Sequence, residues 1–197
     1  MNIYYCQQRS DEWFKLRVGR ITGTSFATMA NGKTSGIDKL VYKTAAERVT
    51  GVSSDSGFSN SDMERGVELE AEARAAYEYE TLTHVQEVGF IALDKFTGVS
   101  PDGLVGDDGG VEIKCPRPYT HMEYLSKGGG WKKYKWQVQG ALWCSSRAWW
   151  DFVSYCPEFP AGKSLLIERV KPDAECFEKL EAGRKMLAER IEAVING

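Results

Sequence analysis

The segment from Ser100 to Pro116 most constrains what this chain can fold into. Two apolar, β-branched runs flank the acidic, glycine-rich stretch 107–110, a pattern typical of two strands joined by a tight turn. A hairpin brings its strands side by side, so Asp102 near the end of the first strand can meet Glu112 on the second. The segment therefore predicts a pair of carboxyl groups held on a β-hairpin.

The second strand of this hairpin also carries a lysine. Residues two apart on a strand share a face, so Glu112 and Lys114 point the same way while Ile113 points into the core. Mg²⁺ prefers oxygen ligands, and Asp102, Glu112 and the Ile113 carbonyl offer three. Lys114 could then lower the pKa of an attacking water or stabilise charge on a pentacovalent phosphate. Glu-x-Lys is a common triplet, however, and an ordinary solvent-facing pair on an amphipathic strand explains it equally well.

Helical patterns surround the hairpin. Helical spacing and capping residues predict helices over 10–17, 24–29, 40–49, 61–81, 119–125, 133–144 and 173–195, and strands are predicted over 85–93, 97–105, 110–115, 149–155 and 164–170. Ser61 and Glu64 predict a capping box, and residues 52–61 a loop. This order predicts an α/β or α+β fold, a mixed central sheet flanked by helices, in one domain over residues 1–197.

Composition excludes several classes of protein. The chain has 197 residues, 42% of them hydrophobic, which suits one folded domain rather than a disordered chain. No apolar run approaches the roughly 20 residues of a membrane helix, and the N-terminal sequence lacks the layout of an export signal. The five cysteines include no C-x-x-C pair, so we expect free thiols in a reducing cytoplasm rather than a disulfide scaffold or a zinc finger.

The charge is segregated along the chain although the net charge is only −3. Residues 55–80 hold eight acidic side chains against two arginines, whereas residues 114–135 hold six basic side chains against Glu123 alone. This pattern is compatible with a basic face for a polyanion beside a cluster of carboxylates. Two ordinary solvated faces are the alternative, and composition alone favours them.

Three further clusters could contribute to a site. Glu70 lies one helical turn after Gly66 and could complete a metal shell, or could be one more exposed acid. Arg17 with the hydroxyls of residues 22–25 could form a phosphate pocket, although N-capping also explains those hydroxyls. Gln137 and Gln139 are two apart on a helix, so at most one points at the site. The isolated histidines leave Ser and Cys without a partner for a catalytic triad.

These clusters, in this order, resemble the YqaJ-type viral recombinases, the phage lambda exonuclease family, within the PD-(D/E)XK nuclease superfamily. The resemblance runs from about Asp11 to Val170 and depends on Trp13–Gly19 with Ile21-Thr22, Gly66-x-x-x-Glu70, Ser100–Leu104, Glu112–Pro116, Gln137-x-Gln139 and the strand 150–155. It implies a restriction-endonuclease-like core. It also implies a 5′→3′ exonuclease that releases 5′-mononucleotides from double-stranded DNA and leaves a 3′ single strand for homologous recombination.

The resemblance also implies a role for each site residue. Asp102, Glu112 and the Ile113 carbonyl would hold metal, Glu70 would assist at a second metal position, Lys114 would activate water and Gln137 would position the site. The 5′ phosphate would be bound by Arg17, Thr24 and Ser100, with Thr24 standing where phage lambda exonuclease has Ser. The implied cofactor is Mg²⁺, for which Mn²⁺ can substitute, with two ions per active site.

The implied partners are duplex DNA ends and a single-strand annealing protein, in a homotrimeric ring that encloses DNA, inside a bacterial or phage-infected cell and not at a membrane. The metal site by itself does not exclude a structure- or sequence-specific endonuclease, although the Arg17 and Thr24 pocket favours a chain end. A non-catalytic DNA-binding module is the alternative from another class, and the intact Asp102, Glu112 and Lys114 argue against it. Residues 53–60 are the candidate for opening the duplex.

Overall fold

The structure is a computed structural model that describes residues 1–54 and 60–197. Half of the predicted loop 52–61, and with it most of the candidate duplex-opening segment 53–60, therefore lies outside the described residues. Two sheets are present: a small one with strand order β1-β3-β4 and a main one with order β2-β5-β6-β7-β8. The strands are β1 Asn2–Tyr4, β2 Val85–Gln86, β3 Phe90–Ala92, β4 Gly98–Val99, β5 Gly103–Val105, β6 Gly109–Lys114, β7 Trp149–Tyr155 and β8 Leu165–Val170.

The main sheet is mixed, as predicted. β6 runs antiparallel to β5 and parallel to β7, and β7 runs antiparallel to β8. β6 and β7 are buried along almost their whole length, since helices cover both faces of the sheet. The α/β fold class is therefore confirmed, and the predicted strands 110–115, 149–155 and 164–170 match within a residue or two.

The other two predicted strands are wrong in extent, because each divides between the two sheets. The predicted strand 85–93 becomes β2 and β3, and the predicted strand 97–105 becomes β4 and β5. Pro101 stands in the second break, where it has no N–H to extend a ladder. In the first break, a Cβ on Gly89 would lie 2.3 Å from the Cys6 sulfur, so glycine allows the N-terminal segment to pass close by. No sequence pattern predicted β1, which pairs with β3.

The helices are α1 Asp11–Arg17, α2 Phe26–Asn31, α3 Thr34–Thr50, α4 Ser61–Thr81, α5 Pro118–Lys127, α6 Lys135–Ser145 and α7 Ala174–Asn196, with short 3₁₀ turns at Gly23–Ser25 and Gly130–Tyr134. Ser10 and Asp173 cap α1 and α7 through their side chains. The predicted capping box on Ser61 is wrong, because Asn60 caps α4 by accepting from the N–H groups of Asp62 and Met63.

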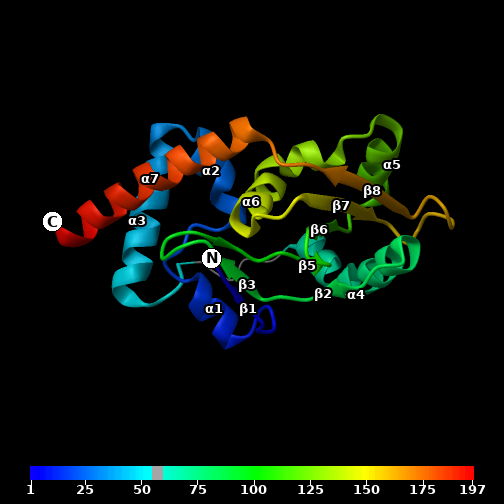
Figure 1. The fold of residues 1–197 in the computed structure, drawn as a ribbon, viewed down its shortest axis with the longest axis horizontal. Coiled ribbons are helices and arrows are strands. Elements are labelled where there is room, and N and C mark those ends of the chain that lie inside the picture. The colour runs from blue at the N-terminus through cyan, green and yellow to red at the C-terminus, as the bar shows by residue number, and fades with distance from the viewer. Residues whose placement is uncertain (55–59) are drawn as a thin grey trace.

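The helices lie on both faces of the main sheet and at one end of the molecule (Figure 1). α4 packs on one face through Ala73 and Tyr77, while α5 and α6 lie toward the other face. α2, α3 and α7 pack together at the end of the molecule away from β8, and α1 lies beside the small sheet. The described helices include none with the length and apolar character to cross a membrane.

Candidate active site

The two carboxyl groups of the hairpin do come together. The register of β5 with β6 pairs Gly103 with Val111, so Asp102 stands just before β5 and opposite Glu112. The Asp102 side chain folds back onto β6, where its Oδ2 accepts a hydrogen bond of 2.6 Å from the Ile113 N–H. Tight hairpin geometry therefore places Asp102 against the strand that carries Glu112, Ile113 and Lys114.

Lys114 and Glu112 share a face of β6 and form an ion pair, with Nζ 2.5 Å from Oε1. The pair is not the solvent-facing one that the triplet alone allows, since the Glu112 side chain is only 7% exposed. Burial works to lower the pKa of Lys114, but the charges of Glu112 and Asp102 outweigh it and raise that pKa. In the structure Lys114 is therefore held as a positive charge beside Glu112.

The surroundings of Asp102 disfavour the charged form of its carboxyl group, whereas those of Lys114 favour the charged form of its amine. Burial, followed by the negative charges of Glu112 and Glu70, raises the pKa of its carboxyl group to about 8, against the lowering effect of Lys114 and the Ile113 N–H. Carboxyl groups this close resist full ionisation unless positive charge is added beside them. Added positive charge would therefore stabilise this cluster of carboxyl groups.

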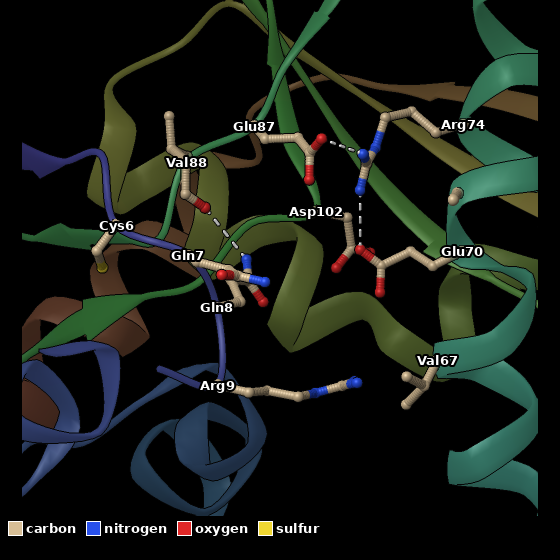
Figure 2. Close-up of a pocket in the computed structure, with 11 residues that line it drawn as sticks. Cys6, Gln7, Gln8, Arg9, Val67, Glu70, Arg74, Glu87, Val88 and Asp102 are labelled. Carbon is tan, nitrogen blue, oxygen red and sulfur yellow. Dashed lines mark hydrogen bonds and ion pairs between the residues drawn. The ribbon is translucent and has the colours of Figure 1, made fainter. Parts of the chain in front are cut away.

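Glu70 reaches the same region from α4. It lines a pocket of about 350 Å³ together with Asp102, and Figure 2 shows the two side chains next to each other. Arg74, one turn further along α4, bonds Glu70 at 3.1 Å and Glu87 at 2.5 Å. The geometry therefore joins α4 to the hairpin, a relation between residues 70 and 102 that no local pattern contains.

The donor set fits a hard divalent cation by its chemistry: three carboxyl groups and the backbone carbonyl of Ile113. In the structure each carboxyl group turns to another partner: Glu112 to Lys114, Glu70 to Arg74, and Asp102 to a backbone N–H. Across residues 1–54 and 60–197, no group of three or more His, Cys, Asp or Glu side chains is arranged to hold a metal ion. A cation would have to draw Glu70 and Glu112 away from their present partners.

A second polar cluster forms around Arg17 at the end of α1. The Arg17 guanidinium donates to Ser100 Oγ at 3.0 Å and to Thr22 Oγ1 at 3.2 Å, and it lies 4.3 Å above the Trp13 ring. The Trp13 indole N–H also reaches Ser100 Oγ, at 2.9 Å. Helical spacing sets Trp13 and Arg17 on one face of α1, and the small sheet brings Ser100 to them.

Thr24 lines a pocket of about 130 Å³ with Arg17 and Thr22. Thr22, not Thr24, makes the hydrogen bond to Arg17, because the 3₁₀ turn at Gly23–Ser25 leaves the Thr24 side chain exposed. The expected 5′-phosphate residues therefore gather in one place: Arg17 and Ser100 in contact, and Thr24 on the wall of the adjoining pocket.

The two glutamines of α6 have different surroundings. Gln139 is buried, donating to the Lys171 carbonyl and accepting from the Asp173 N–H, so it fastens α6 to the start of α7. Gln137 is half-buried and lies beside Gly23, where a Cβ on that glycine would be 4.0 Å from its Cγ. Gln137 therefore lies beside the loop of the Arg17 cluster, while Gln139 is used in the contact with α7.

The sequence reasoning missed Gln8. Its side-chain amide donates to the carbonyls of Pro101, at 2.7 Å, and Val88, at 3.2 Å. These bonds hold the N-terminal segment against the residue just before Asp102. A lone glutamine in a loop carries no pattern that could have identified this role.

Comparison with known proteins places this geometry in context. Residues 12–148 match the family model of the YqaJ-like viral recombinase domain. A search of curated protein sequences finds no significant match.

Solved structures give close matches over the whole chain. The complex of LHK-Exo with dAMP matches with a TM-score of 0.85 and 35% identity, covering 95% of each chain. The alkaline exonuclease LHK-Exo from Laribacter hongkongensis matches with a TM-score of 0.80 and 36% identity, covering 94% of this chain and 96% of that one. A phage-related exonuclease from Haemophilus somnus 129PT, at 13% identity and a TM-score of 0.71 over 93% and 98% of the two chains, shares the fold.

Proposed function

The chain belongs to the YqaJ-like viral recombinase family, and from that premise we propose that it degrades one strand of linear double-stranded DNA in the 5′→3′ direction, with Mg²⁺ as cofactor. Its similarity over nearly the whole chain to an alkaline exonuclease supports a DNA exonuclease role. The proposal treats residues 1–197 as one nuclease domain.

The observation that carries the proposed polarity is the short connection between the two polar clusters. Ser100 bonds Arg17, and Asp102, two residues later, bonds the β6 strand. Two extended residues span about 7 Å, so only a short length of DNA strand separates the two clusters. A 5′ phosphate held by Arg17 and Ser100 would therefore set the first phosphodiester bonds of the strand beside Asp102.

The proposed reaction is hydrolysis of a phosphodiester bond. A water oxygen forms a bond to phosphorus while the bond from phosphorus to the 3′ oxygen of the terminal nucleotide breaks, and a proton passes from water to that oxygen. Lys114, protonated beside Glu112, would stabilise the negative charge that grows on the phosphate oxygens. The shortened strand again ends in a 5′ phosphate, which Arg17 could bind for the next cut.

Asp102, Glu112, Glu70 and the Ile113 carbonyl are the groups that would hold Mg²⁺, as two ions or with Mn²⁺ in their place. When bound, the cation polarises the phosphate and offsets the repulsion between it and the carboxylates. In the free protein Glu112 and Glu70 are paired with Lys114 and Arg74. These pairs keep the carboxyl groups compensated until a cation replaces part of that charge.

The proposed product is a 5′-mononucleotide and a duplex with a 3′ single-stranded tail. LHK-Exo was solved in complex with dAMP, a mononucleotide, which supports this product class. A tail of this kind suits a single-strand annealing protein, so we place the chain in homologous recombination in the cytoplasm of a bacterial or phage-infected cell. A homotrimeric ring around DNA would keep the enzyme on its substrate.

The test is digestion of a linear duplex labelled at either 5′ or 3′ ends, with Mg²⁺ or with EDTA, beside covalently closed circular DNA. We expect metal-dependent loss of the 5′-ended strands, release of mononucleotides and an intact circle. Nicking of the circle would assign the chain to endonucleases instead. DNA binding without any cleavage would indicate that the chain is a non-catalytic DNA-binding module.

A further inference from the structure

Arg9 has a backbone conformation that its residue type disfavours. Its φ is +68°, and the other described non-glycine residues with positive φ are Leu82 and Ser146. Leu82 and Ser146 end α4 and α6, where a left-handed residue commonly closes a helix. Arg9 instead lies between β1 and α1, as the third residue of a turn that the Ser10 N–H closes onto the Gln7 carbonyl at 3.2 Å, a position where glycine is the usual residue.

The segment around Arg9 is held firmly in place. Gln8 bonds the carbonyls of Val88 and Pro101 on one side. Ser10 donates to the Gln7 carbonyl at 2.7 Å on the other, and caps α1. These contacts fix the backbone of Arg9 next to the strand that carries Asp102, so the strained residue is oriented by its neighbours.

The side chain of Arg9 lies at the pocket that Glu70 and Asp102 line. Figure 2 shows it extending from the N-terminal segment toward Val67 of α4, below the two carboxyl groups in that view. It is exposed, and within the described residues no hydrogen bond or ion pair joins it to a carboxylate. Arg74, the other arginine of the pocket, is instead paired with Glu70 and Glu87.

A phosphate at this pocket would meet three acidic side chains, and it therefore needs a cation that those acids have not already neutralised. A guanidinium suits that role, since its fork of N–H groups matches phosphate oxygens. Arg9 and Arg17 stand at opposite ends of α1, whose seven residues span about 10 Å. Arg9 lines the pocket of Glu70 and Asp102, whereas Arg17 lines the separate pocket of Thr22 and Thr24, so Arg9 is suited to a phosphate other than the one at Arg17.

We propose that Arg9 binds a phosphate of the DNA substrate at the mouth of the Glu70–Asp102 pocket, separate from the terminal 5′ phosphate. This inference rests on the proposed DNA substrate and adds a contact that positions the strand at the carboxyl groups.

The substitution Arg9→Gly tests this, because glycine adopts φ +68° without strain, so the change removes the side chain and its charge without straining the backbone. Ser146→Gly, at φ +55° on the surface at the end of α6, is the matched control. Arg9→Lys keeps the charge. Each change is made in wild type for single-turnover degradation, and in a Lys114→Ala background for fluorescence anisotropy with 5′-phosphorylated and 5′-hydroxyl duplexes across a range of NaCl with Mg²⁺.

We expect Arg9→Gly to melt no lower than the parent and to bind both duplexes about three- to tenfold more weakly. Its plot of log affinity against log salt should be shallower by about 0.9, the loss of one phosphate contact. Ser146→Gly should leave affinity and slope unchanged, and Arg9→Lys should retain the slope. Unchanged binding by Arg9→Gly would overturn the inference, as would a loss confined to 5′-phosphorylated ends. A wild-type chain that neither binds nor degrades DNA would overturn the proposed function first.

Discussion

On the proposed function, replacing Arg17 with alanine should reduce the preference for 5′-phosphorylated over 5′-hydroxyl ends. Among the described residues, the substitution takes away the hydrogen bonds to Ser100 at 3.0 Å and Thr22 at 3.2 Å, and the stacking on Trp13. Ser100 and Thr22 remain as hydroxyl groups that can still contact DNA. What is lost specifically is the positive charge opposite a terminal phosphate.

The size of the effect follows from the surroundings of the guanidinium. A hydrogen bond to a charged group contributes about 1.5–3 kcal/mol, whereas full Coulomb attraction at 4 Å with an effective dielectric of 20 would give about 4 kcal/mol. Arg17 is half-buried beside a pocket of about 130 Å³, so solvent screens part of that attraction. We therefore expect a change of about 2 kcal/mol, or about thirtyfold, in the ratio of kcat/KM for phosphorylated and hydroxyl ends.

The assay compares single-turnover degradation of two duplexes that differ only in the 5′ phosphate. Lys15→Ala is the matched control, since Lys15 is exposed on the same helix and does not line the pocket. Arg17→Lys should fall between the wild type and Arg17→Ala, because it keeps the charge and loses the fork. Equal loss on both duplexes, or a large fall in melting temperature that tracks the loss, would assign Arg17 to the fold and refute the reasoning.

Lys114→Ala should lower kcat by at least about a thousandfold with DNA binding preserved, since it removes the charge beside the phosphate; nuclease activity surviving that change would refute the site. Tyr77→Phe should lower the free energy of unfolding by about 1.5–3 kcal/mol, because the buried Tyr77 hydroxyl donates to Asp151 at 2.8 Å; urea unfolding with a change below about 0.5 kcal/mol would contradict this. Arg65 holds the pKa of Glu158 at about 2, below its ordinary value, so the pair stabilises the fold above about pH 4.5 and that stability is lost as pH falls toward 2. Glu158→Gln should therefore be less stable than wild type at pH 7 by at most about 1 kcal/mol, since Glu158 is 45% exposed. This difference in the free energy of unfolding should narrow between about pH 5 and pH 3. A difference that does not depend on pH would count against the prediction.

Much of the fold could be predicted because it depends on local patterns. Apolar spacing indicated α4 and α7, Ser10 and Asp173 indicated their neighbouring helix starts, and the hairpin of β5 and β6 followed from its turn. Helix periodicity and tight turns are set by residues a few positions apart, so the sequence contains them directly. The errors fell where an element's length depended on distant partners, as when Pro101 and Gly89 divided two predicted strands between two sheets.

The candidate site was predicted in the same uneven way. Asp102, Glu112 and Lys114 belong to one hairpin, so their approach could be inferred from spacing alone. The buried, paired state of Glu112 could not, because burial depends on the helices that cover the sheet. The roles of Gln8 and Arg9 could not be predicted, because a glutamine and an arginine in a loop belong to no local pattern and their contacts depend on distant segments.

By itself, then, the sequence determined the mixed fold class and the chemical groups of the hairpin, both consequences of short-range geometry. The resemblance grouped Arg17 with Ser100 and Glu70 with Asp102, but only the tertiary structure shows the contacts: Ser100 meets Arg17 across 83 positions of chain, and Glu70 lines the pocket of Asp102. Contacts between distant segments depend on how whole elements pack, and many packings are compatible with the same local pattern. The Gln8 contacts and the left-handed Arg9 arise in the same way, from the close passage of the N-terminal segment beside the strand that leads to Asp102.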